Sequence, residues 1–130
     1  MRKHSTARMR LVAAVVLALL TILTPVLVAA QPVARDEAAA LKAEADRAMD
    51  ALRYEDALAK YDASYKLRPD AALLYNQGRA LEGLGRFPEA LDKLVAFQNA
   101  ASKELLARLG EALKTNIDEL RGRVAVMTIE

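Results

Sequence analysis

The residues of this chain that could perform acid–base chemistry are two pairs of adjacent carboxylates, Glu55 with Asp56 and Asp118 with Glu119. Adjacent residues on a helix point in different directions, so the members of each pair do not face each other. The chain has no cysteine, and its single histidine, His4, lies near the N-terminus. Because general acid–base catalysis needs positioned partners, we expect solvated carboxylates. The sequence predicts no catalytic residue, no cofactor and no metal site, and therefore no enzyme.

The first thirty residues have the pattern of a secretory signal peptide. Residues 1–10 carry four basic residues and no acid, residues 11–30 carry no charge, and the small residues Val28 and Ala30 precede Gln31. This order of basic, apolar and small residues predicts cleavage between Ala30 and Gln31. The mature protein would then be located in the periplasm or outside the cell. The apolar run is also about as long as the ~20 residues that span a bilayer. An uncleaved anchor in the inner membrane is therefore the alternative.

The charge of the chain argues against nucleic-acid binding. The full chain has 19 basic and 17 acidic residues, but four of the basic residues lie in the first thirty positions. Residues 31–130 thus contain 15 basic and 17 acidic residues, a net charge of −2. They contain no contiguous basic stripe of the kind that binds nucleic acid.

Two consecutive segments, residues 38–70 and 71–101, repeat each other with an offset of 33 residues. The coinciding positions are small, aromatic and turn residues: Tyr54 to Leu58 with Phe87 to Leu91, Ala45 with Gly78, and Tyr61 with Leu94. A period of about 20–50 residues is typical of stacked supersecondary units. Such units usually present a binding surface to a partner.

Apolar periodicity predicts an all-α fold made of two helix–turn–helix hairpins in a short solenoid. After a linker at residues 31–36, with Asp36 as an N-cap, we expect four helices at residues 37–51, 55–67, 71–84 and 88–100. Gly85 is expected to take the left-handed turn conformation. A fifth helix, residues 102–123, would be capped by Ser102 and cover the repeats. Residues 124–130 are β-branched and partly alternating, which predicts a short strand or extended tail.

The repeated segments resemble the tetratricopeptide repeat family, whose 34-residue units are helical hairpins. The signature positions are Leu41, Ala45, Tyr54, Ala57, Tyr61, Pro69 and Asp70 in the first unit and Gly78, Leu81, Gly85, Phe87, Ala90 and Leu94 in the second. Leu52 departs from the family pattern, which usually has glycine there, and Phe97 stands where a small residue is usual. The two repeats, the leucine-rich helix that follows them and the closing run of residues 124–129 also resemble exported bacterial envelope proteins in which a PEGA-type domain follows.

The resemblance implies a groove, lined by the first helix of each hairpin, that binds a peptide or a partner helix. Carried over by position, its residues are Lys42, Asp46, Met49, Tyr75, Asn76, Arg79 and Glu82. A subset of the family clamps a terminal carboxylate with lysine and asparagine, which Lys42 and Asn76 match. The resemblance thus implies an adaptor or scaffold for a protein or peptide partner in the bacterial cell envelope. The alternatives are a membrane-anchored assembly module, the truncated repeat half of a longer protein, and a homodimer through residues 102–123.

Overall fold

The computed structural model describes the backbone of residues 24–129 and the side chains of residues 32–129, and every described element is a helix. The helices are α2 (Thr24–Asp50), α3 (Tyr54–Leu67), α4 (Ala71–Gly83), α5 (Phe87–Ala100) and α6 (Lys103–Ile129). The expected all-α class is confirmed for this part of the chain. Most of the predicted signal peptide or anchor, residues 1–30, lies outside the described residues. Within them, no helix has both the length and the apolar character needed to span a membrane.

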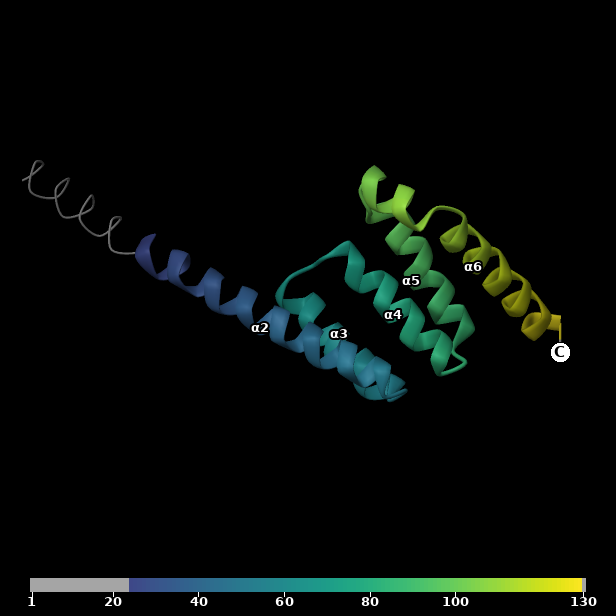
Figure 1. The fold of residues 1–130 in the computed structure, drawn as a ribbon, viewed down its shortest axis with the longest axis horizontal. Helices are drawn as coiled ribbons and strands as arrows, with labels where there is room; N and C mark the ends of the chain where they lie inside the picture. The colour runs from purple at the N-terminus through teal and green to yellow at the C-terminus, as the bar shows by residue number, and fades with distance from the viewer. Residues whose placement is uncertain (1–23, 130) are drawn as a thin grey trace, which may run out of the picture. The chain divides into compact units, whose positions relative to one another are not determined.

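The chain divides at Ala34 into two units, and the second, residues 35–130, contains the two hairpins. In this unit α3 packs against α4, α4 against α5, and α5 against α6, so that consecutive helices lie side by side (Figure 1). From α3 to α6, each helix therefore packs against its neighbours in the chain, and the pair α4 and α5 has the most extensive contact.

The turns that join α2 to α3 and α4 to α5 are the same structure repeated after 33 residues. In the first turn, the Leu52 N–H donates to the Met49 carbonyl at 2.9 Å and the Arg53 N–H to the Ala48 carbonyl at 2.8 Å. In the second turn, the Gly85 N–H donates to the Glu82 carbonyl and the Arg86 N–H to the Leu81 carbonyl, both at 2.9 Å. The residues before α3 and α5 have nearly equal dihedral angles, with φ −88° and ψ 69° at Arg53 and φ −85° and ψ 63° at Arg86. The self-similarity of the sequence is therefore a similarity of backbone structure.

Small residues lie where the helices approach most closely. Ala45, Ala57 and Ala90 are fully buried. A Cβ atom added to Gly78 on α4 would lie 2.6 Å from Cδ2 of Leu94 on α5. These positions hold alanine or glycine because a larger side chain would separate the helices.

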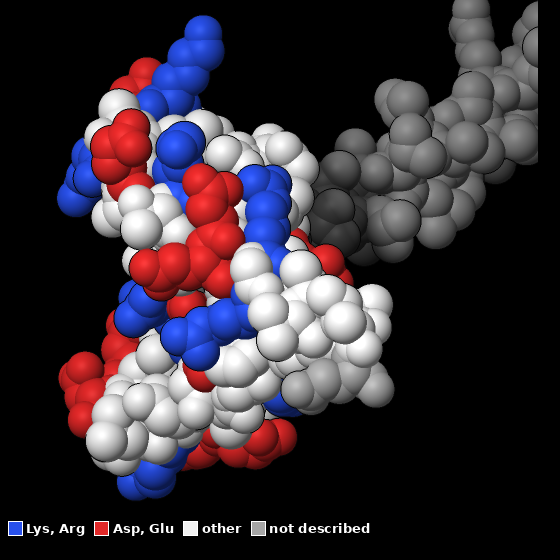
Figure 2. Space-filling model, turned by 90° about the vertical axis from the view of Figure 1, so that its right-hand side faces the viewer, with Lys and Arg blue, Asp and Glu red and all other residues white. Residues whose placement is uncertain are grey.

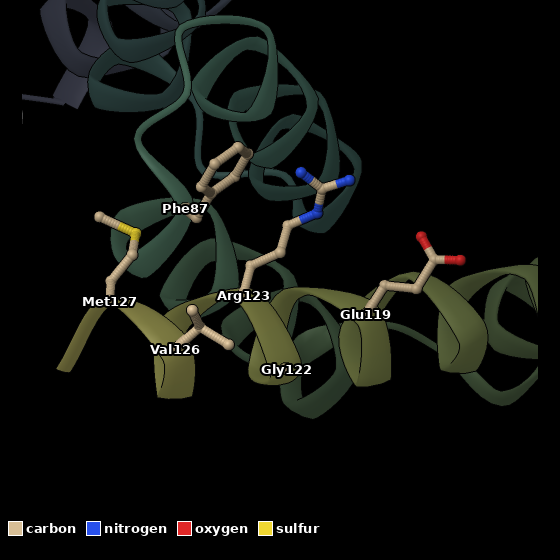
Figure 3. Close-up of a pocket in the computed structure, with 6 residues that line it drawn as sticks. All are labelled: Phe87, Glu119, Gly122, Arg123, Val126 and Met127. Carbon is tan, nitrogen blue, oxygen red and sulfur yellow. The ribbon is translucent and has the colours of Figure 1, made fainter. Parts of the chain in front are cut away.

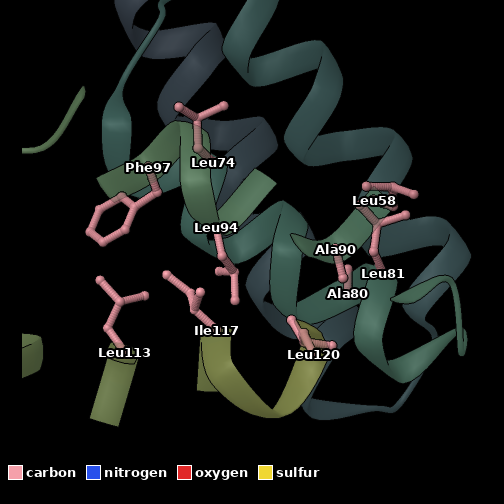
Figure 4. Packing of buried hydrophobic residues seen from close by; sticks show 10 residues of the cluster. All are labelled: Leu58, Leu74, Ala80, Leu81, Ala90, Leu94, Phe97, Leu113, Ile117 and Leu120. Atoms are coloured by element: carbon pink, nitrogen blue, oxygen red, sulfur yellow. The ribbon is translucent and has the colours of Figure 1, made fainter. Parts of the chain in front are cut away.

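One hydrophobic cluster joins α3, α4, α5 and α6 (Figure 4). Its buried members are Leu58, Leu74, Ala80, Leu81, Ala90, Leu94, Phe97, Leu113, Ile117 and Leu120. Fully burying a leucine or phenylalanine side chain stabilises a fold by about 1.5–3 kcal/mol. Leu113, Ile117 and Leu120 of α6 thus pack on the second hairpin.

The last helix, α6, begins as predicted but ends later. The Leu105 N–H donates to Oγ of Ser102 at 3.2 Å, which confirms the cap. The helix is interrupted at Gly110, whose φ of 45° and ψ of −129° are accessible mainly to glycine. The strand predicted for residues 124–130 is wrong, because residues 124–129 continue the helix. Extending a formed helix gives each residue a hydrogen bond, whereas a lone strand leaves its backbone groups unpaired.

The predicted start of the first helix also needs correction. The helix α2 begins at Thr24 and passes through Pro32, so residues 31–36 are helical and Asp36 is not an N-cap. A proline inside a helix removes one backbone hydrogen bond. The neighbouring residues include several alanines, which have the highest helix propensity, and the helix continues through this point.

Candidate functional site

The seven candidate groove residues lie on two helices, three on α2 and four on α4. By the 33-residue offset, Lys42 corresponds to Tyr75, Asp46 to Arg79 and Met49 to Glu82. The side chain of Arg79 is exposed, and the other six are half-buried. Equivalent faces of α2 and α4 therefore remain accessible to a partner.

On α2, the Asp46 carboxylate is held by two hydrogen bonds. Nζ of Lys42 donates to Oδ2 at 2.7 Å, and the hydroxyl of Tyr61 on α3 donates to Oδ1 at 2.7 Å. Burial raises the pKa of Asp46, but these two hydrogen bonds together outweigh burial and hold it below its usual value. Burial and the hydrogen bond to Asp46 raise the pKa of Tyr61. The Tyr61 hydroxyl was not among the predicted site residues.

On α4, the Glu82 carboxylate joins the groove face to α6. Nη1 of Arg79 lies 3.4 Å from Oε2 of Glu82, and Nδ2 of Asn116 donates to the same oxygen at 3.2 Å. Sequence reasoning missed Asn116. The sequence hinted at Asn116 only through its position next to Ile117, which lies on the apolar face of α6. The Arg79 guanidinium is exposed and paired only across one helical turn, so it can exchange this pair for a partner's acid.

The remaining candidate residues, Tyr75, Met49 and Asn76, are half-buried. The ring centroids of Tyr75 and Phe97 are 5.5 Å apart, with the rings tilted by 56°. Met49 contacts both hydrophobic clusters, the one that joins α3 to α6 and the one formed by α2, α3 and Leu73. The Asn76 side chain is half-buried, and among the described residues its amide makes no side-chain hydrogen bond.

A small cavity borders the candidate face where α2, α3 and α4 meet. It has a volume of about 120 Å³, and its lining includes Ala39, Lys42, Arg68 and Leu73. The lining combines apolar surface with side chains of both charges, because Asp70 lines the cavity beside Lys42 and Arg68. It could accept a small side chain of a bound peptide.

A wider depression of about 570 Å³ lies on α6, away from the predicted site. Its lining residues are Phe87, Glu119, Gly122, Arg123, Val126 and Met127 (Figure 3). The guanidinium carbon of Arg123 is 5.0 Å from the centroid of the Phe87 ring, a cation–π contact. The sequence did not predict this depression, although residues 102–123 were an alternative dimer interface.

The charged side chains of the surface are of both signs. In Figure 2, acidic and basic groups are interspersed on the face shown, with uncharged areas between them. Many of these charges form ion pairs across one helical turn, such as Arg86 with Glu89 and Lys114 with Asp118. Long-range attraction of a highly charged partner is therefore not a feature of this face.

No protein-family model matches the chain, and no curated protein is significantly similar to it. The tetratricopeptide interpretation accordingly rests on the residues themselves and on the repeated turns.

Proposed function

We propose that the protein is an exported, non-catalytic adaptor of the tetratricopeptide type, which binds a protein or peptide partner in the bacterial cell envelope. One observation carries the proposal: the two hairpin turns repeat in detail after 33 residues, so α2 and α4 present equivalent faces. In a short solenoid these faces would form one continuous groove. Repeat proteins commonly use such surfaces for binding.

The chemistry of the α4 face supports recognition of a peptide. Tyrosine and arginine contribute strongly to binding energy at protein interfaces, and Tyr75 and Arg79 are one helical turn apart. Between them, the Asn76 amide can donate to a peptide carbonyl and accept from a peptide N–H. The terminal-carboxylate clamp of Lys42 and Asn76 is less well supported, because Lys42 already pairs with Asp46.

The proposal is tested by capturing partners from a native envelope extract with the purified chain. The test variant carries Tyr75→Phe, Asn76→Ala and Arg79→Ala, which removes three polar groups and leaves a ring against Phe97. The matched control carries Lys66→Ala and Asn99→Ala, two exposed positions on α3 and α5. We expect a protein that is retained by the wild type and the control and lost with the test variant. Equal capture by all three would contradict the groove assignment.

A further inference from the structure

The outer face of α6 carries a stripe of exposed residues at alternating spacings of three and four. The outer stripe consists of Ala112, Thr115, Glu119, Gly122, Val126 and Ile129, all of them exposed. The buried residues of the same helix, Leu113, Ile117 and Leu120, lie on the opposite side and pack on the second hairpin. Val126 is 62% and Ile129 86% exposed, so one end of the stripe is distinctly apolar.

The outer stripe is complementary to itself when reversed. Its C-terminal half has the apolar residues Val126 and Ile129, and its N-terminal half has the small residue Ala112 and the β-branched residue Thr115. Gly122 lies near the middle, and a Cβ atom added there would meet no atom within 4 Å. In an antiparallel pair of α6 helices, Ile129 would lie over Ala112 of the other copy and Val126 over Thr115. Gly122 would let the two backbones approach closely.

Two charged residues, Glu119 within the stripe and Arg123 beside it, fit the same register. Glu119 and Arg123 are one turn apart, yet within the described residues neither forms an ion pair. Arg123 is directed toward Phe87, and Glu119 points away from both (Figure 3). The antiparallel register that places Ile129 over Ala112 places Glu119 of each copy over Gly122 of the other, directly beside Arg123. Two symmetric ion pairs would then flank the crossing point.

We propose that the outer stripe binds a second copy of this chain, forming a two-fold symmetric dimer through antiparallel α6 helices. A two-fold interface uses the same patch on both subunits, so it requires self-complementarity of shape and charge. The fit of Ile129 over Ala112 and the proximity of Glu119 to Arg123 of the other copy meet this requirement. A single helix pair is smaller than a standard interface of about 1,600 Å², so the dimer should dissociate on dilution. This inference does not depend on the groove.

Cysteine cross-linking tests the register directly, because the chain has no cysteine of its own. The full chain carrying both Thr115→Cys and Val126→Cys should form a covalent dimer under mild oxidation. A disulfide needs Cα atoms about 4.4–6.8 Å apart. In the proposed register the two copies of position 115 are about 16 Å apart along the helices, so Thr115→Cys alone should stay monomeric on a non-reducing gel. Failure of the double variant, or equal cross-linking by the single one, would overturn the proposal.

A second measurement uses the open space at Gly122. Sedimentation equilibrium should show a dimer for the full chain and for the control Ala59→Gln on α3, and loss of the dimer for Gly122→Gln with helicity unchanged. Glu119→Arg should also weaken the dimer, and adding Arg123→Glu to it should restore association. An association that persists in Gly122→Gln, as expected if another segment of the chain drives it, would contradict the α6 interface.

Discussion

At the scale of single residues, the turn positions Leu52 and Gly85 hold the same backbone conformation with different side chains. Their φ angles are 59° and 72°, in the left-handed region where glycine is favoured. The Leu52 side chain is 69% exposed, so it gains little from burial. The first turn therefore carries a local strain that the second turn lacks.

Relieving this strain should stabilise the protein. We expect Leu52→Gly to raise the free energy of unfolding by about 1 kcal/mol, because the left-handed conformation costs other residues roughly 1–2 kcal/mol. The reciprocal change, Gly85→Ala, should lower it by a similar amount. Urea unfolding of both variants measures the effect, and a Leu52→Gly variant less stable than the wild type would show that Leu52 makes a stabilising contact.

The Asp46 carboxylate should make stability depend on pH in the acid range. Because its pKa is lowered in the folded protein, its contribution is complete above the ordinary value of 3.8 and is lost as the pH falls through the lowered pKa. Asp46→Asn should therefore be less stable than the wild type at pH 7, and the difference should shrink below about pH 4. Urea unfolding at several pH values tests this. A difference that stays constant with pH would mean that the ionised carboxylate contributes nothing.

The Tyr61 hydroxyl on α3, which donates to Asp46, provides a matched test. Tyr61→Phe keeps the buried ring and removes the hydrogen bond to Asp46, so we expect a loss of about 1 kcal/mol. The pKa of Tyr61 is raised in the folded state, so its contribution is present below pH 10 and lost as the pH rises beyond that value. The wild type should thus lose stability above pH 10 more steeply than Tyr61→Phe, as followed by circular dichroism. If the stability of the two proteins fell equally with rising pH, the hydrogen bond from Tyr61 to Asp46 would be contradicted.

At the scale of elements, the close approach of α4 and α5 depends on the absence of a side chain at Gly78. Gly78→Ala should lower the free energy of unfolding by about 1–3 kcal/mol, because the new methyl group would overlap the fully buried Leu94. The control Gly122→Ala, whose new methyl group meets no atom of its own chain, should instead raise it by about 1 kcal/mol through helix propensity when the protein is dilute enough to be monomeric. Equal thermal unfolding of Gly78→Ala and the wild type would show that the helices are not in contact there.

The hairpins could be predicted from the sequence because their signals are local. Buried alanines, the turn at Gly85 and the 3.6-residue apolar period all lie within the helices that they define. The two errors concern residues 31–36, which lie inside α2, and residues 124–129, which form the end of α6. There Pro32 and a run of β-branched residues suggested a boundary, but helix propagation prevailed over these local preferences.

At the scale of the whole molecule, the sequence predicted which residues of the candidate site share a face but not what they contact. The correspondence of Lys42 with Tyr75 and of Asp46 with Arg79 follows from the repeat. The hydrogen bonds from Tyr61 to Asp46 and from Asn116 to Glu82 join residues 15 and 34 positions apart. Such contacts depend on how the helices pack, which no local pattern specifies. That these residues bind a partner stays a prediction.

The most direct test of partner binding is site-specific photo-cross-linking in cells that produce the protein. A photoreactive amino acid would replace Arg79 on the candidate face of α4 or, as a control, the exposed Lys66 on α3. We predict that position 79 yields a covalent adduct with a discrete envelope protein and that position 66 does not. An adduct from position 66 alone, or none from position 79 in the folded chain, would contradict the proposed adaptor function.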